Sequence, residues 1–421
     1  MNIAIISQYY PASYRPGFDT EFAQFVRDGH DIAIYSSGSM GSADNETIAR
    51  FKLDQRTINY PNTVRDVPKY LGRIVTSLVR RPSFCLRAAG LARRVQGSTR
   101  RRITEWARML VLPEHAPDLW LIHNLTSAIA FTWLDRLYPG VPIGLYYHGP
   151  EVPRYTGELS PAEVQTVFDE CDVVFTNTRF MMQHLVERGC APAKLRVVPG
   201  GFDFEKFPQG LPRTFRPNGR LRLISAGRLS EEKGMQFALE AVRDVIREGM
   251  RDVSFTIVGE GHLRRSLEQF VRDNALSDHV RFLGTLSSNE LFREVANADA
   301  LILPSIVFGN FIENQARIVQ ETLLLRTTVI TTMVGGVPES IPDAMRPFAI
   351  PPEDSAALAM AIRRLAEVSP DDLAKLGDAS RDWVRKHYDI RTINDRLLQM
   401  TLGHADPAPD TRWVTEVPAL Q

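Results

Sequence analysis

Short apolar runs alternate with amphipathic stretches along the first half of the chain. The runs at 2–7, 31–36, 119–123, 143–147, 173–176 and 195–198 predict β-strands. Two stretches, 19–27 and 179–189, repeat apolar residues at helical spacing and meet glycine at their ends, so they predict helices. Strands that alternate with helices favour βαβ units and a parallel sheet.

The same alternation restarts near Leu221. Strands are predicted at 221–226, 253–258, 280–283, 300–303 and 328–331, and helices at 233–248, 262–274, 291–296, 318–325, 354–365 and 371–402. A proline-containing stretch, 204–217, separates the two series and suits an exposed connection. We therefore expect an α/β fold with two Rossmann-like domains, 1–206 and 207–380, and a poorly ordered tail at 404–421.

The composition is that of an ordinary globular protein. Of 421 residues, 44% are hydrophobic and 24% are charged, and no apolar run approaches the roughly 18 residues of a membrane span. The amino terminus has the pattern of a strand without a basic leader, which argues against a secretory signal. Three cysteines, far apart and odd in number, favour buried free thiols in a reducing compartment. We therefore expect a cytoplasmic protein.

The formal charge is zero overall but is unevenly distributed. Between residues 65 and 108, twelve Lys and Arg residues accompany only two acids, Asp66 and Glu105, and apolar residues are interspersed among them. Such basic amphipathic helices can bind an anionic membrane surface, here the inner face of the plasma membrane, or an anionic substrate. A solvated Arg-rich face is the alternative. Nucleic acid is not expected, since no aromatic pattern for base stacking accompanies the charges. The oligomeric state stays open.

Two cations follow the strand at 221–226. Arg228 and Lys233 lie after Gly227 in a glycine-flanked turn that opens a helix. Arginine offers a planar fork of donors and lysine a mobile point charge, so together they suit a multiply charged diphosphate. When the bond to a diphosphate leaving group breaks, negative charge grows on its oxygen, and fixed cations stabilise that charge. A surface charge pair at a helix start is the alternative.

Two carboxylates, Glu313 and Glu321, lie eight positions apart, about two helical turns. Glu313 belongs to the loop after the strand at 300–303, and Glu321 to the following helix. Apolar neighbours such as Ile318 and Val319 disfavour a fully solvated surface for this segment. A strand, a loop with one acid and a helix with the second can present both groups to a sugar nucleotide at the carboxyl end of a sheet.

The sequence lacks the motifs of several other kinds of binding or catalytic site. Gly259 and Gly261 begin a dinucleotide fingerprint, but Arg264 stands where the third glycine belongs. No Asp-x-Asp follows a strand, no Cys/His cluster exists, and neither a P-loop nor a Gly-x-Ser-x-Gly motif is present. We therefore expect chemistry that needs neither a metal ion nor a bound cofactor.

Five motifs follow one another along the second half of the chain. They are Gly227-Arg-Leu-Ser-Glu-Glu-Lys-Gly234, Ile257-Val-Gly-Glu-Gly261, Val280-Arg-Phe-Leu-Gly284, the Glu313/Glu321 pair and Gly335-Gly-Val-Pro-Glu339. Through them the chain resembles the family-4 retaining glycosyltransferases of GT-B fold, especially bacterial members that build exopolysaccharides or glycosylated natural products. Tyr146-Tyr-His-Gly149 and Gly200-Gly-Phe-Asp203 extend the resemblance to the first half. The resemblance implies two domains that face each other across a cleft, and a last helix, 381–403, that crosses back to the first domain.

The resemblance also implies residue roles. A nucleotide-diphosphate sugar, UDP- or GDP-linked, would bind the second domain, with Glu321 on the ribose and Glu313 on the sugar. The implied catalytic residues are His148, Arg228, Lys233 and Glu313. The implied donor-binding residues are Gly17, Gly227, Arg228, Lys233, Gly284, Asn314, Gln315, Ala316, Arg317, Ile318 and Glu321. Because Asn314-Gln-Ala316 replaces the Gly-Phe-Gly of many members, the identity of the sugar stays open.

The expected reaction moves a hexosyl group from the nucleotide sugar to an acceptor sugar, a lipid-linked glycan or a small natural product. The resemblance implies retention of anomeric configuration. No carboxylate stands out as a covalent nucleophile, which fits a front-face route in which the leaving phosphate helps to deprotonate the acceptor. The alternatives are a sugar-nucleotide epimerase or a non-glycosidic coupling enzyme of the same fold, or a catalytically silent sugar-nucleotide-binding subunit.

Overall fold

The computed structural model describes residues 1–12, 16–41, 45–95, 97–149, 159–208, 211, 213–216, 219–309 and 311–403. They form two compact units. Of the described residues, the first holds Met1–Asn177, Met181–Phe202 and 390–403, and the second holds Thr178–Phe180 and Asp203–Asp389. The chain thus changes unit slightly before the boundary expected at 206/207. The predicted tail, 404–421, lies outside the described residues.

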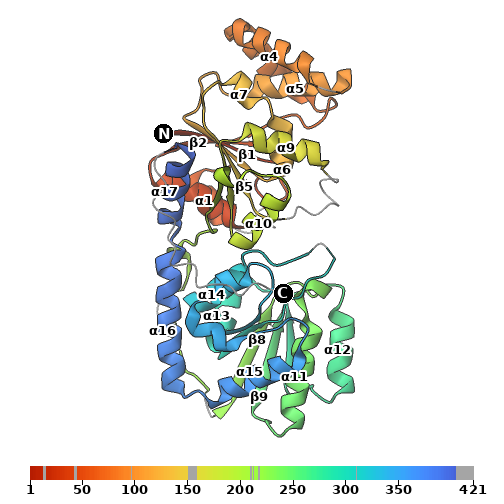
Figure 1. The fold of residues 1–421 in the computed structure, drawn as a ribbon, viewed down its shortest axis with the longest axis vertical. Coiled ribbons are helices and arrows are strands. Elements are labelled where there is room, and N and C mark those ends of the chain that lie inside the picture. The colour runs from red at the N-terminus through yellow and green to blue at the C-terminus, as the bar shows by residue number, and fades with distance from the viewer. Residues whose placement is uncertain are drawn as a thin grey trace. The chain divides into compact units, whose positions relative to one another are not determined.

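The first unit contains a seven-stranded parallel sheet in the order β3-β2-β1-β4-β5-β6-β7 (Figure 1). Its strands are β1 (Asn2–Ser7), β2 (Asp31–Ser36), β3 (Thr57–Asn59), β4 (Leu119–His123), β5 (Ile143–Tyr147), β6 (Val173–Thr176) and β7 (Leu195–Val197). Its helices are α1 (Pro16–Arg27), α2 (Asn45–Phe51), α3 (Leu71–Arg80), α4 (Pro82–Arg94), α5 (Thr99–Val111), α6 (Leu125–Ala128), α7 (Leu134–Leu137), α9 (Pro161–Glu170), α10 (Arg179–Glu187) and α17 (Ile390–Thr401). Short 3₁₀ turns lie at η1 (Val67–Tyr70), η2 (Ile129–Phe131) and η3 (Pro192–Lys194).

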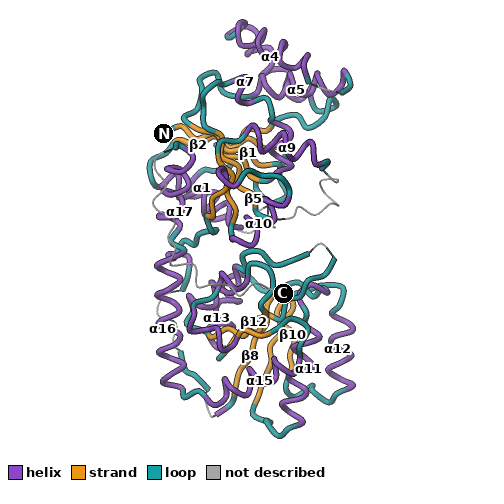
Figure 2. Tube along the Cα trace, viewed as in Figure 1, coloured by secondary structure: helices purple, strands orange, loops and turns teal. Residues whose placement is uncertain are grey.

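The second unit contains a six-stranded parallel sheet in the order β10-β9-β8-β11-β12-β13. Its strands are β8 (Leu221–Ala226), β9 (Val253–Val258), β10 (Val280–Gly284), β11 (Ala300–Leu303), β12 (Thr328–Thr332) and β13 (Ala349–Ile350). Its helices are α11 (Met235–Arg247), α12 (Arg264–Asp273), α13 (Ser288–Asn297), α14 (Arg317–Leu324), α15 (Ser355–Glu367) and α16 (Pro370–His387), with 3₁₀ turns η4 (Phe204–Lys206), η6 (Glu231–Lys233), η7 (Val337–Ser340) and η8 (Asp343–Phe348). In each unit the strands lie inside and the helices outside (Figure 2).

The expectation of an α/β protein with two parallel-sheet domains is confirmed. The strand runs are buried along almost their whole length, as in a sheet covered on both faces. Two short strands, β3 and β13, were not predicted, because three and two residues are too few for a periodic signal. The three cysteines are buried and free, as expected.

The helix predicted at 371–402 is wrong in one respect, since it consists of two helices. α16 ends at His387 and α17 begins at Ile390. Between them the chain pairs with the segment after β7, where the Ile390 amide donates to the Phe202 carbonyl. Gly201 permits this approach, because a Cβ there would lie 2.8 Å from the Ile390 Cα. Only α17, and not the whole segment expected at 381–403, therefore belongs to the first unit.

α17 completes the core of the first unit. Its apolar residues Ile393, Leu397 and Leu398 belong to the same buried cluster as residues of α1, β1 and β2. Buried Asn394 adds a polar anchor, because its side-chain amide donates to the Glu21 carbonyl on α1 at 2.9 Å. The carboxyl-terminal helix thus contributes to the hydrophobic core of the amino-terminal sheet.

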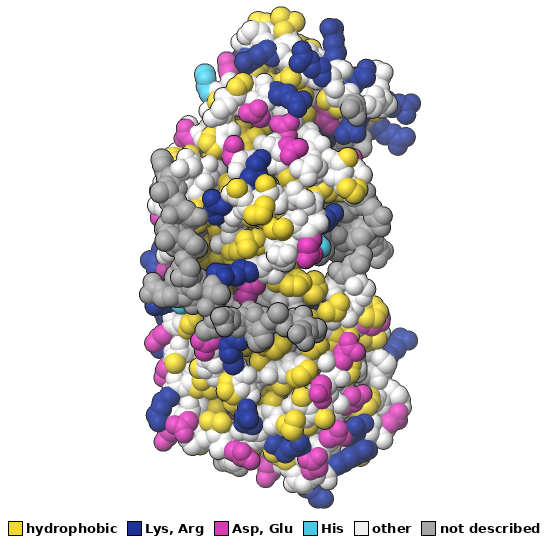
Figure 3. Space-filling view, viewed as in Figure 1, with side chains coloured by type: hydrophobic (Ala, Val, Ile, Leu, Met, Phe, Trp, Pro, Cys, Tyr) yellow, Lys and Arg dark blue, Asp and Glu magenta, His cyan; other side chains and the backbone are white. Residues whose placement is uncertain are grey.

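The helices α3, α4 and α5 form an insertion between β3 and β4, over which many cationic side chains gather (Figure 3). A buried ion pair ties α5 to the rest of the unit. The Arg108 guanidinium donates to Glu105 at 2.8 Å and to the Ala130 carbonyl at 3.0 Å. The Trp133 indole also donates to Glu105, at 3.1 Å. Both charged side chains are less than a tenth exposed, so each depends on its partner.

Replacing Glu105 by Ala should lower the free energy of unfolding by about 3–5 kcal/mol, because the Arg108 guanidinium stays buried without its carboxylate. Chemical denaturation followed by tryptophan fluorescence measures this change. The matched control is Lys375→Ala, since that lysine is 77% exposed and pairs with Asp372 on the surface. Its loss should change stability by less than about 1 kcal/mol. Equal effects of the two substitutions would contradict the assignment.

Candidate functional site

The second sheet reverses its strand order between β8 and β11. From β8 the chain moves to β9 and β10 on one side, and from β11 it moves to β12 and β13 on the other. The loops that follow these two strands therefore leave the sheet in opposite directions, and a crevice opens at the carboxyl ends of the strands. In open parallel sheets this crevice is where ligands bind.

One residue from each of these two loops meets here. The Lys233 ammonium, after β8, forms an ion pair with Oε1 of Glu313, after β11. The Ser305 hydroxyl donates to the same oxygen at 3.0 Å. Lys233 and Glu313 are 19% and 17% exposed, so the pair is largely shielded but open on one side. The structure thus brings together two of the four predicted catalytic residues.

Arg228 lies in the same loop as Lys233 but is held differently. Its guanidinium pairs with Glu232 at 2.9 Å, and its side chain is 66% exposed. The guanidinium carbon also lies 5.8 Å from the centre of the Phe311 ring. Arg228 is therefore a solvent-facing cation paired with Glu232, whereas Lys233 is largely shielded and pairs with Glu313.

A turn of two glycines holds the backbone of Glu313. The Gly336 amide donates to the Glu313 carbonyl at 2.9 Å. Gly335 has a φ of +56°, and a Cβ there would collide with the Glu313 carbonyl. Only glycine combines this left-handed conformation with so close an approach. The Gly-Gly pair of the fifth motif therefore positions the backbone of Glu313.

Glu321 lies on α14, which begins at Arg317 just after the Glu313 loop. Its side chain is partly exposed. Burial raises the pKa of the Glu321 carboxyl, and the positive charge of Arg317 opposes this only in part. A desolvated carboxylate at the edge of a crevice is short of solvent partners, which suits an acceptor for hydroxyl donors.

The other residues predicted to bind the donor lie around these groups. Gly227 directly follows β8, and Gly284 is the last residue of β10, so both lie at the same edge of the sheet. Asn314 accepts from the Thr178 hydroxyl at 2.6 Å. Ala316 is buried at the start of α14, while Gln315 and Ile318 on either side of it are partly exposed. The structure thus gathers the segment 313–321 at one edge, and Asn314 has a structural partner that the sequence did not indicate.

His148 lies in the first unit, at the corresponding edge of the other sheet. β4 pairs with β5 so that His123 stands opposite Tyr146, and His148 projects two residues beyond Tyr146. The two imidazoles meet, with His123 Nδ1 2.9 Å from His148 Nε2. On its other side, His123 Nε2 lies 3.5 Å from the Glu21 carboxylate of α1. His123 is fully buried and His148 partly exposed.

The Glu21, His123 and His148 side chains form a polar cluster enclosed by aromatic rings. In the contact between the two imidazoles one nitrogen donates and the other accepts, according to the tautomers of the two rings. Phe18 and Tyr146 enclose the two rings, and Tyr146 lies 4.3 Å from His148, centre to centre.

Gly17, two residues before the helix predicted at 19–27, was expected to bind the donor from a loop, and this placement is wrong. It lies in the first turn of α1, which begins at Pro16. Proline suits the first turn of a helix because its missing N–H has no partner there anyway, so the helix starts earlier than the apolar pattern indicates.

Two further polar residues at these sites gave little signal in the sequence. Ser305 lies two residues after the end of β11, and the Thr332 hydroxyl on β12 donates to its carbonyl at 2.5 Å. A lone serine after a strand has no distinctive pattern. Glu21 could have been noticed, because it stands between Phe18 and Phe22 on the apolar face of α1 and is buried. A charged residue at an apolar helical position is expected to have a partner.

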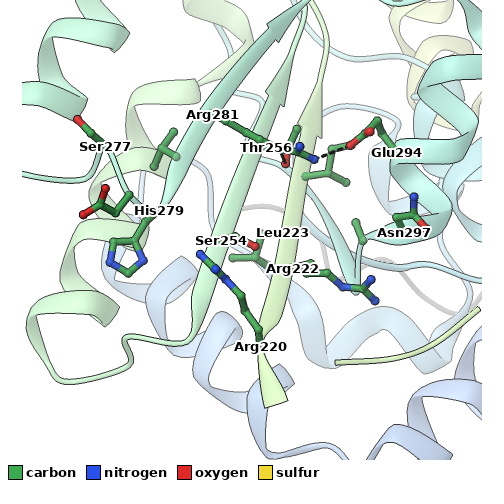
Figure 4. A pocket seen from close by; sticks show the side chains of 14 residues that line it. Arg220, Arg222, Leu223, Ser254, Thr256, Ser277, His279, Arg281, Glu294 and Asn297 are labelled. Carbon is green, nitrogen blue, oxygen red and sulfur yellow. Dashed lines mark hydrogen bonds and ion pairs between the residues drawn. The ribbon is translucent and has the colours of Figure 1, made fainter. Parts of the chain in front are cut away.

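A cavity of about 330 Å³ lies elsewhere in the second unit, over the amino-terminal halves of β8, β9 and β10 (Figure 4). Two of the cations that line it, Arg222 and Arg281, already have protein partners. Arg281 donates to Thr256 at 2.8 Å and to Glu294 at 2.6 Å, and Arg222 pairs with Asp299. Because ligands of such sheets bind at the opposite end, we assign no substrate to this cavity.

Within the described residues, no group of three or more His, Cys, Asp or Glu side chains could hold a metal ion. In the same residues, no helix is long and apolar enough to span a membrane.

Comparison with known proteins agrees with this geometry. The model of Glycosyltransferase Family 4 matches residues 22–206, and that of Glycosyl transferases group 1 matches residues 220–367. A protein of Escherichia coli (strain K12), provisionally named as the colanic acid biosynthesis glycosyltransferase WcaL, is 27% identical over 67% of this chain and 70% of its own length. Glycogen synthase of Mycobacterium tuberculosis (strain H37Rv) is 28% identical over 70% of each chain.

Solved structures share the fold. Anabaena Alr3699/HepE in complex with UDP-glucose superposes with a TM-score of 0.62, at 16% identity, over 95% of this chain and 99% of that one. Sucrose-phosphate synthase of Thermosynechococcus elongatus gives a TM-score of 0.60 at 17% identity, over 95% and 98%. Two parallel-sheet domains, matches to both family models and named glycosyltransferases among its relatives lead to one conclusion: the chain belongs to the family-4 glycosyltransferases of GT-B fold.

Proposed function

We propose that this glycosyltransferase moves a hexosyl group from a UDP- or GDP-linked sugar to an acceptor, with retention of anomeric configuration and without a metal ion. The carrying observation is the Lys233–Glu313 pair at the strand-order reversal of the second sheet. It puts a cation and a carboxylate side by side at the edge where such sheets bind nucleotides. The UDP and UDP-glucose complexes among the structural neighbours support this class of donor.

Lys233 acts on the leaving group in this proposal. Its ammonium has three donors, so it can keep Glu313 and still contact a β-phosphate oxygen. As the glycosidic bond breaks, that oxygen gains negative charge, which a fixed cation in a shielded site stabilises. Arg228 supplies a second cation by exchanging Glu232 for the diphosphate. The first amides of α14, at Arg317 and Ile318, add helix-terminus donors.

Glu313 and Glu321 divide the recognition of the donor. Glu321 accepts from the two ribose hydroxyls, since its two oxygens match a vicinal diol. Oε1 of Glu313 contacts Lys233 and Ser305, so its second oxygen is the one that accepts from the sugar hydroxyls in this proposal. Two cations beside two acids let the site bind a charged diphosphate and a neutral sugar at neighbouring positions. Asn314 and Gln315 replace small residues there and shape the sugar pocket.

His148 is proposed to meet the transferred sugar through its Nδ1 lone pair. In this proposal the Glu21 carboxylate, 3.5 Å from His123 Nε2, favours a proton on that nitrogen, so that His123 accepts at Nδ1 and His148 donates from Nε2. The relatives' names refer to colanic acid and glycogen, and one further relative, of Streptomyces kanamyceticus, is a 2-deoxystreptamine glucosyltransferase. They support an acceptor that is a growing glycan, a lipid-linked sugar or a small natural product. Membrane contact through residues 65–108 is a separate proposal that rests on surface exposure.

A nucleotide panel tests the proposed function. Melting of the protein is followed with UDP, GDP, ADP and TDP, and a ligand at a hundred times its dissociation constant stabilises by about 2.7 kcal/mol. UDP or GDP should raise the melting temperature most. Labelled UDP-glucose or GDP-mannose alone should not be converted to an epimer, since transfer needs an acceptor. Epimerisation without an acceptor, or no response to any nucleotide, would overturn the proposal.

Replacing Lys233 by Ala should lower kcat by roughly a hundred- to a thousand-fold, because the leaving phosphate loses its fixed cation and Glu313 loses its ion-pair partner. Donor turnover, by transfer or hydrolysis, measures the effect. Lys375→Ala serves as the control, since it removes the same charge from the surface of the same unit. A Lys233→Ala enzyme that keeps its kcat would exclude this role.

Replacing Glu321 by Gln should separate stability from binding. The raised pKa of this carboxyl means that the folded state binds a proton more readily than the unfolded state, so the group destabilises the unliganded protein above that pKa. The variant should then be more stable than the wild type at neutral and alkaline pH, and the gain should vanish in acid. Affinity for the nucleotide should fall roughly 10- to 150-fold, the value of one hydrogen bond to a charged group. Unchanged affinity would count against ribose contact.

Replacing Glu21 by Gln tests its role as a positioning residue. The variant should lose about tenfold in kcat, the value of one net hydrogen bond of about 1.4 kcal/mol, while the KM for the donor stays unchanged. The nitrogen NMR shifts of His148 should change from the Nε2–H tautomer to a mixture. A merely structural role would lower the melting temperature and leave the tautomer as it is.

A further inference from the structure

The insertion α3–α5 exposes apolar side chains out of proportion to its length. Half of the exposed large apolar side chains in the described residues, six of twelve, belong to these three helices. Exposed aliphatic groups in such a concentration are unfavourable in water and mark a surface that binds a partner. Of the other six exposed side chains, only Met1 and Met40 belong to the described part of the first unit, so the exposure is concentrated in the insertion.

α3 directs its apolar side outward. The exposed residues form one stripe at helical spacing: Leu71, Val75, Leu78 and Val79, which are 55%, 54%, 43% and 76% exposed. The helix docks through a narrower face, where Ile74 and Ser77 are buried and the Ser77 hydroxyl donates to the Leu110 carbonyl of α5 at 2.9 Å. The helix is therefore anchored while its broader apolar stripe stays uncovered within the unit.

The same surface is strongly cationic. Of the twelve Lys and Arg residues between 65 and 108, ten are exposed. The two acids of this segment offset only a small part of this charge, because Glu105 is buried with Arg108 and Asp66 pairs with one of the ten cations, Lys69. Figure 3 shows dark-blue side chains beside yellow ones over α4 and α5. A partner must therefore accept aliphatic groups and bring negative charge.

These requirements select one occupant. A second copy of the chain would meet ten cations with ten more, and nucleic acid offers no apolar layer for the aliphatic stripe. An anionic bilayer surface supplies both parts, phosphate headgroups for the guanidinium groups and an acyl boundary for the aliphatic stripe. Each cation near such a surface contributes favourably until salt screens it.

We propose that α3, with the cations around it, binds the headgroup region of an anionic membrane. This assigns the enzyme a lipid partner and deepens the proposed function, because an acceptor held on a lipid would be presented to the site at that surface. The membrane contact itself does not depend on the nucleotide-sugar site. Failure of either proposal can therefore be recognised without the other.

Co-sedimentation of the full chain with phosphatidylcholine vesicles, with and without phosphatidylglycerol, tests the proposal. The chain should pellet with the anionic vesicles and not with the neutral ones, and salt should weaken the binding. The double variant Val75→Asp/Val79→Asp should lose at least about tenfold in affinity, and Arg73→Glu/Arg80→Glu should lose as much. Because all four side chains are exposed, the variants should melt like the wild type.

The controls carry the same changes on the second unit. Met360→Asp alters a side chain on α15 that is 58% exposed, and Arg251→Glu/Arg265→Glu reverses two exposed cations. Both should bind anionic vesicles like the wild type. Equal binding to neutral vesicles, no binding to anionic ones, or no effect of the α3 variants would overturn the proposal. So would a dimer in sedimentation velocity that Val75→Asp/Val79→Asp dissolves, since it would identify a second copy as the occupant.

Discussion

The reversal of strand order in each parallel sheet is the constraint on which the rest of the structure depends. In the first unit the reversal lies between β1 and β4, and in the second between β8 and β11. Right-handed crossovers then carry neighbouring loops to opposite faces, so their first residues face a common crevice. Lys233 and Glu313 meet at one reversal, and Glu21 and His123 at the other. The strand order of each sheet therefore determines where its polar cluster lies.

Charge and conformation at the second reversal favour ligand binding over stability. Glu321 stays desolvated beside a single opposing charge, and Gly335 adopts a conformation that other residues resist. Such features destabilise the unliganded protein slightly and are typical of binding sites. Lys233 and Glu313 neutralise each other, which makes this shielded position tolerable for both charges.

The fold was largely predictable because long apolar runs and their alternation with helices specify a parallel sheet. Lys233 and Glu313 were also predictable, since each follows a strong strand signal. The break at Tyr388 was not, because it depends on contacts with residues distant in sequence, such as Phe202. The contact of Ser305 with Glu313 was not predictable either, because a single serine after a strand has no distinctive sequence pattern. The exposed stripe of α3 could not be told from a buried one, because helical periodicity identifies an apolar face but not what covers it.

The coupling between Lys233 and Glu313 in donor binding is the most direct test of this account. A double-mutant cycle with Lys233→Met, Glu313→Gln and the combined variant, measured by calorimetry with the nucleotide sugar, isolates that coupling. If both residues hold one donor molecule in one site, the effects should be non-additive by at least about 1 kcal/mol. Effects that add within about 0.5 kcal/mol, or affinities equal to that of the wild type, would contradict the assignment of the site.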